Sequence, residues 1–102
     1  MIRIKSGVTF HEDSFRTYAI PYLIRIAIQT APSGYDPTIT SAGDGRHSVN
    51  SAHYTGKALD FRTRDLKKEE VPIWADRMRM ALGNQYFVLV ESDHIHVQYN
   101  GD

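Results

Sequence analysis

An aspartate, Asp60, stands inside a short run of residues that is otherwise typical of a buried β-strand. Residues 57–62 are expected to form this strand, with Leu59 and Phe61 on one face and Asp60 on the other. Burying a carboxylate among apolar residues is costly unless a partner stabilises its charge. The chain must therefore fold so that another polar group or a metal ion reaches Asp60.

A second β-prone region, near the end of the chain, offers such partners. Residues 86–91 are rich in strand-forming types, and His94–Tyr99 alternates between polar and apolar side chains. The two residues between these segments predict a turn, so the segments should form a hairpin. Alternation places His94 and His96 on the same face of the second strand. Both histidines are thus available to a single site.

The sequence also predicts two helices. Asp13 and Ser14 form a plausible N-cap for a helix over residues 13–30, in which Pro21 either causes a kink or starts the second half. An amphipathic helix is expected over residues 69–82, with Pro72 in its first turn. Both helices are long enough to cover one face of a small sheet.

Two shorter segments complete the expected sheet. Thr38–Ser41 is β-branched enough for a short strand, and residues 1–10 fit a strand or an extended arm. With 102 residues, 41% of them hydrophobic, the chain is large enough for one core. The sequence therefore predicts a single α+β domain over residues 1–102. It should have a mostly antiparallel sheet, two main helices on one face and a metal site on the other.

Charge balance and residue types disfavour several classes of function. Twelve basic residues match twelve acidic ones, so nucleic acid is not an expected partner. The absence of cysteine removes thiolate ligands, so any metal must be held by histidine and carboxylate. No run approaches the roughly 20 apolar residues that span a membrane, and no signal peptide is visible. Oligomeric state and localisation are left open.

Three residues form a candidate zinc site. A catalytic zinc ion typically takes three protein ligands and keeps a fourth position for water. His53, Asp60 and His96 meet this count. Zinc lowers the pKa of a bound water from about 15.7 to roughly 7. Glu91 is then expected to act as the general base, and His94 to donate a hydrogen bond to the oxyanion that forms on the attacked carbonyl.

The spacing of these residues resembles that of a known family. It is similar to the zinc metallopeptidases that act on peptidoglycan as D-Ala-D-Ala carboxypeptidases or L-Ala-D-Glu endopeptidases. It is equally similar to the zinc-containing amino-terminal domain of Hedgehog signalling proteins, which shares their fold. The matching pattern is Ser51-x-His53-x-x-Gly56-x-Ala58-x-Asp60, followed by Glu91 and His94-x-His96. The resemblance implies a Hedgehog/DD-peptidase-like fold.

The resemblance also implies a role for each matching position. His53, Asp60 and His96 match the zinc ligands of the family, and Glu91 matches its catalytic base. In one branch of the family the ligand histidine follows the acid by three positions, which would select His94 instead of His96. We favour His96, because the strand around it resembles the endopeptidase and Hedgehog branches.

Residues before the first motif are expected to contact the substrate. The family often has an arginine or histidine there, which Arg46 and His47 match. Ser51 is expected to orient this loop by hydrogen bonding, since no base is placed to make it a nucleophile. The implied function is zinc-dependent hydrolysis of peptidoglycan stem or cross-link peptides, in a host or phage enzyme. The alternative is a non-catalytic, zinc-stabilised binding module of the Hedgehog-like fold.

Overall fold

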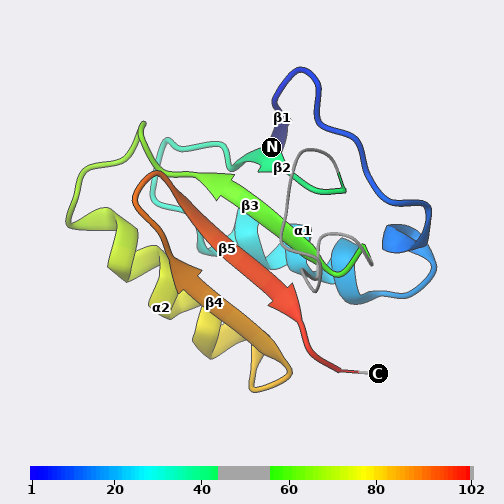
Figure 1. Ribbon diagram of the computed structural model, residues 1–102. Helices are drawn as coiled ribbons and strands as arrows, with labels where there is room; N and C mark the ends of the chain where they lie inside the picture. The colour runs from blue at the N-terminus through cyan, green and yellow to red at the C-terminus, as the bar shows by residue number, and fades with distance from the viewer. Residues whose placement is uncertain (44–55, 102) are drawn as a thin grey trace.

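The protein folds as an α+β domain, seen in a computed structural model that describes residues 1–43 and 56–101 (Figure 1). In chain order the elements are β1 (Arg3–Ile4), the 3₁₀ helix η1 (Glu12–Phe15), α1 (Ala19–Thr30), β2 (Thr38–Ser41), β3 (Ala58–Arg62), α2 (Glu70–Leu82), β4 (Tyr86–Val90) and β5 (His94–Tyr99). The strands form one sheet in the order β1-β2-β3-β5-β4. The expected class, with two helices and a mostly antiparallel sheet, is confirmed.

The sheet is mixed because of its first strand. β1 pairs with β2 in parallel, whereas β2 with β3, β3 with β5, and β5 with β4 are antiparallel. β5 therefore lies between β3 and β4, although it follows both in the chain. This insertion brings the predicted histidine strand directly beside the strand of Asp60.

The first helix begins later than predicted. Instead of continuing into a helix, Asp13 lies in η1, where its backbone N–H donates to Nδ1 of His11 (3.0 Å). The α-helix begins at Ala19, and Pro21 lies in its first turn, where a missing N–H breaks no helical hydrogen bond. The predicted start at Asp13 is therefore wrong, because residues that cap an α-helix also favour short turns. Pro21 therefore lies in the first turn of the helix and does not kink it.

Both helices pack on the same face of the sheet, and Figure 1 shows them behind it. Trp74 of α2 is the largest buried side chain; its ring meets Phe61 of β3 edge-on at a centroid distance of 5.8 Å. Its Nε1 donates to Thr30 Oγ1 at the end of α1 (3.2 Å). Other large, fully buried side chains of the core are Ile20, Leu23, Ile39, Leu59, Met78, Ile95 and Val97. Neither α1 nor α2 covers the opposite face, which carries Asp60.

None of the helices in residues 1–43 and 56–101 is long and apolar enough to cross a membrane.

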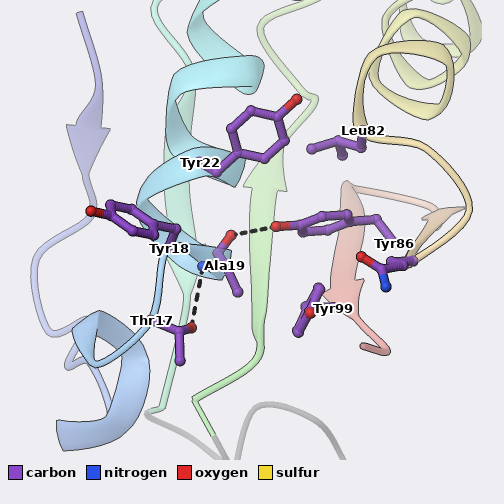
Figure 2. Close-up of a pocket in the computed structure, with 8 residues that line it drawn as sticks. Thr17, Tyr18, Ala19, Tyr22, Leu82, Tyr86 and Tyr99 are labelled. Carbon is purple, nitrogen blue, oxygen red and sulfur yellow. Dashed lines mark hydrogen bonds between the residues drawn. The ribbon is translucent and has the colours of Figure 1, made fainter. Parts of the chain in front are cut away.

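Tyr86 ties the start of α1 to the edge of the sheet. Figure 2 shows its ring reaching from β4 into a pocket lined by Tyr22 and Tyr99. Its hydroxyl donates to the backbone carbonyl of Ala19 (2.8 Å). Burial raises the pKa of Tyr86 from 10.0 to about 12, because ionisation would place a charge in this partly apolar setting. The neutral hydroxyl is therefore part of the folded state.

Replacing Tyr86 with phenylalanine should lower the free energy of unfolding at pH 8 by about 1 kcal/mol, the usual contribution of one hydrogen bond. The folded-state pKa of Tyr86 lies above its unfolded value of 10.0, so its stabilisation is fully present below pH 10 and is lost as the pH rises toward 12. Urea unfolding at pH 8 and pH 11 measures both effects. Tyr18→Phe, at a side chain 88% exposed, is the control. Equal stability of the Tyr86 variant and the parent at pH 8 would contradict the prediction.

Candidate metal centre

The register of β3 and β5 sets polar side chains side by side on the face of the sheet opposite α1 and α2. Asp60 pairs with His96, Arg62 with His94 and Ala58 with Gln98. Directly opposed residues of antiparallel strands project to the same face and lie close enough to interact. Residues that are 36 positions apart in the sequence, Asp60 and His96, therefore meet.

Gly56, the glycine of the first motif, determines how the chain enters β3. Its φ of 73° lies in the left-handed region that favours glycine. A Cβ at this position would also lie 2.9 Å from Oγ of Ser14. Glycine thus allows the chain to pass close to η1 immediately before the strand that carries Asp60.

Asp60 and His96 are in direct contact. Oδ1 of Asp60 is 3.0 Å from Nδ1 of His96, and the two side chains are only 12% and 16% exposed. On the other side of the ring, Nε2 of His96 is 2.7 Å from Oε1 of Gln98. The hydrogen bond to Asp60 raises the pKa of His96 above its usual value and outweighs burial, which lowers this pKa. The hydrogen bond to Gln98 raises it further. The carboxylate of Asp60 therefore has the partner that its buried position requires.

His94 approaches the same carboxylate from its other oxygen. Nε2 of His94 is 3.7 Å from Oδ2 of Asp60. Nδ1 of His94 is 2.6 Å from Oδ1 of Asp93, which lies in the hairpin turn. This hydrogen bond lowers the pKa of Asp93, which therefore accepts from His94 as a carboxylate. Asp93 thus fixes the ring so that Nε2 is directed toward Asp60.

Glu91 lies at the end of the hairpin. β4 ends at Val90, one residue before the predicted boundary, and the backbone N–H of Glu91 donates to the carbonyl of His94 (2.8 Å). The side chain is exposed, and its negative charge contributes to the raised pKa of His96. An acid that is open to solvent and whose charge acts on His96 is available to a molecule bound at this site.

The donor groups at this site fit zinc. Carboxylate oxygen and imidazole nitrogen are common zinc ligands, and two ligands of a tetrahedral site at 2.0–2.1 Å from the metal are separated by about 3.3 Å. The 3.0 Å between Oδ1 of Asp60 and Nδ1 of His96 is close to this value. Within residues 1–43 and 56–101 no group of three His, Asp or Glu side chains could hold a metal ion. The third predicted ligand, His53, lies outside these residues, as do Arg46, His47 and Ser51.

Two contacts at the site were not predicted from the sequence. No role was inferred from the sequence for Gln98, although it continues the alternation of His94 and His96. Asp93 was interpreted only as a turn residue, although turn residues also favour hydrogen bonds from their side chains. In the structure both hold histidine rings in position.

A comparison of the chain with models of known protein families finds no match.

Proposed function

We propose that the protein is a zinc-dependent peptidase that hydrolyses a peptide bond in the stem or cross-link peptides of peptidoglycan, with a Hedgehog/DD-peptidase-like fold. The observation that carries the proposal is the carboxylate of Asp60, nearly buried and approached by His96 and His94 on the face of the sheet opposite α1 and α2. The spacing of the first motif, which contains Asp60, supports the same function.

Asp60, His96 and His53 would hold the zinc ion. His96 is favoured over His94 as a ligand because its ring nitrogen is closer to the carboxylate of Asp60, at 3.0 Å against 3.7 Å. His94 is in addition held by Asp93. Zinc, when bound, would polarise the scissile carbonyl and make hydroxide available near neutral pH.

The remaining residues would move protons and stabilise charge. Glu91 takes the proton of the attacking water while the new C–O bond forms, and it passes that proton to the leaving amine when the C–N bond breaks. His94 directs Nε2 toward the site and stabilises the oxyanion of the tetrahedral intermediate when that nitrogen carries a proton. Arg46, His47 and Ser51 remain predicted substrate contacts.

Metal analysis and product analysis together test this function. The purified protein should hold one zinc ion per chain and release fragments of defined mass from peptidoglycan, identified by mass spectrometry. A chelator should stop the release, and added zinc should restore it. Because the masses identify the bond, the same experiment distinguishes D-Ala-D-Ala from L-Ala-D-Glu cleavage. A zinc-loaded protein that leaves both bonds intact is not this peptidase.

A zinc-stabilised binding module is the second candidate, and the surface of β4 favours it. Phe87 and Leu89, at 45% and 40% exposure, lie opposite Gln98 and His96 on an edge strand. Exposed apolar side chains on a free edge are suited to binding another chain. For this candidate, chelation should lower the melting temperature, because a ligand bound only to the folded state stabilises it, yet no bond should be cleaved.

A further inference from the structure

A hollow lies next to His94, beside the proposed metal centre. It has a volume of about 330 Å³ and is open to solvent. Its lining comes from four parts of the fold and consists of Lys5, Thr40, Arg62, Arg64, Asp93 and His94. Because His94 belongs both to this lining and to the proposed catalytic site, the two lie side by side.

Backbone hydrogen bonds hold the walls of the hollow in place. The N–H of Lys5 donates to the carbonyl of Ile39 in β2 (2.9 Å), which anchors the segment after β1. The N–H of Thr63 donates to the carbonyl of Asp93 (3.2 Å), which joins the turn after β3 to the hairpin turn. The basic side chains of the hollow therefore come from anchored parts of the backbone.

The charge of the hollow is predominantly positive. Lys5, Arg62 and Arg64 form no ion pair with any residue in the described ranges 1–43 and 56–101. The one carboxylate in the lining, Asp93, is already hydrogen bonded to His94 (2.6 Å). Like charges gathered in a hollow repel one another and attract an anion. A guanidinium group in particular offers two parallel N–H donors to a carboxylate.

The distance from the catalytic site limits where that anion lies in a substrate. Arg62 is two positions after Asp60 on the same face of β3, which corresponds to about 6.6 to 6.8 Å along a strand. An extended peptide advances about 3.3 to 3.6 Å per residue. A group bound in the hollow is thus one or two residues from a carbonyl placed over Asp60.

We propose that this hollow is a specificity subsite for a free carboxylate on the leaving-amine side of the scissile bond, bound by Arg62 and Arg64 with Lys5. The inference rests on the proposed peptidase function and assigns its substrate class. Both bonds under consideration fit it, since D-Ala-D-Ala ends in a carboxylate and D-Glu carries its own after the L-Ala-D-Glu bond.

The test compares each peptide with its amidated counterpart. A stem peptide ending in D-Ala-D-Ala and one containing L-Ala-D-Glu are prepared with the relevant carboxylate free or converted to an amide. Arg62→Gln and Arg64→Gln should each raise KM for the cleaved free-carboxylate peptide roughly 10- to 100-fold, as expected for loss of a charge-assisted hydrogen bond. Neither variant should change KM for the amidated peptide or the zinc content. Arg77→Gln, an exposed position on α2, is the control with the same charge change.

Two outcomes would overturn the subsite. One is an equal loss on free and amidated peptides in the Arg62 and Arg64 variants, which would indicate a structural role. The other is that amidation leaves KM of the parent protein unchanged. Arg64→Gln, at an exposed turn position, keeps the test valid if Arg62→Gln fails to fold.

Binding measurements separate this inference from the proposed function. If the parent protein hydrolyses none of the peptides, the peptidase proposal fails, and NMR titration then tests the subsite alone. Tighter binding of the free-carboxylate peptide than of its amide, with shifts at the amides of Thr40 and His94, would support the subsite. Equal binding of the two peptides would refute it.

Discussion

Replacing Asp60 with asparagine is expected to remove both zinc binding and hydrolysis. The amide has nearly the shape of the carboxylate but no charge, so it is a poor zinc ligand. Loss of a residue that only hydrogen bonds to a metal ligand typically lowers metal affinity roughly 10- to 100-fold. Loss of a ligand itself, as proposed for Asp60, should lower zinc affinity by more than this. The zinc-free variant should also lose about 1–3 kcal/mol of stability, because the hydrogen bond to His96 loses its charged acceptor. Metal analysis, peptide hydrolysis and urea unfolding measure these three effects.

Asp65→Asn is the matched control for this substitution. Asp65 is exposed in the turn after β3, so its replacement makes the same chemical change outside the site. The control should keep the zinc content and activity of the parent. If Asp60→Asn bound zinc as tightly as the control, Asp60 would not be a ligand and the proposed site would be wrong.

Replacing Glu91 with glutamine should lower kcat by about 10²- to 10⁴-fold, the usual contribution of a general base. Zinc content should not change, because Glu91 is not a proposed ligand. Stability should also stay close to that of the parent, since the side chain is exposed. Steady-state hydrolysis of a stem peptide, with metal analysis on the same sample, checks the combination.

Glu69→Gln provides the comparison for Glu91. Glu69 is an exposed acid immediately before α2, a helix that packs on the opposite face of the sheet from Asp60. Its replacement should leave kcat unchanged. A Glu91 variant that retained the full kcat of this control would exclude Glu91 as the base and would favour the binding-module candidate.

Segments in which apolar residues recur at regular spacing were predicted well from the sequence. The structure has a strand at Ala58–Arg62, a hairpin with β5 at His94–Tyr99, and α2 beginning at Glu70, one residue from its predicted start. The start of α1 was missed because aspartate favours short turns as well as the N-cap of a helix, and Asp13 lies in η1. The parallel pairing of β1 with β2 was not predicted, since it joins segments 35 positions apart, as in Arg3 with Thr38.

Part of the site followed from the same periodicity. Alternation placed His94 and His96 on one face of their strand and Asp60 on one face of its own. It did not give the register, and a shift of one residue would have turned every side chain of a strand to the other face. The pairing of Asp60 with His96 depends on how the whole sheet packs on the helices. The basic hollow depends on one more long-range pairing, since Lys5 reaches it through the pairing of β1 with β2.

The position of β5 between β3 and β4 has a consequence for how the protein folds. The β4–β5 hairpin is local in sequence and can form from contacts between neighbouring residues. Asp60 and His96, 36 positions apart, meet only when that hairpin docks along β3. Long-range pairings of this kind are slow steps, because the chain loses loop entropy before the contacts form. We therefore expect Asp60 and His96, the proposed zinc ligands, to meet more slowly than the hairpin forms, and uptake of the metal would then report the docking of β5 on β3.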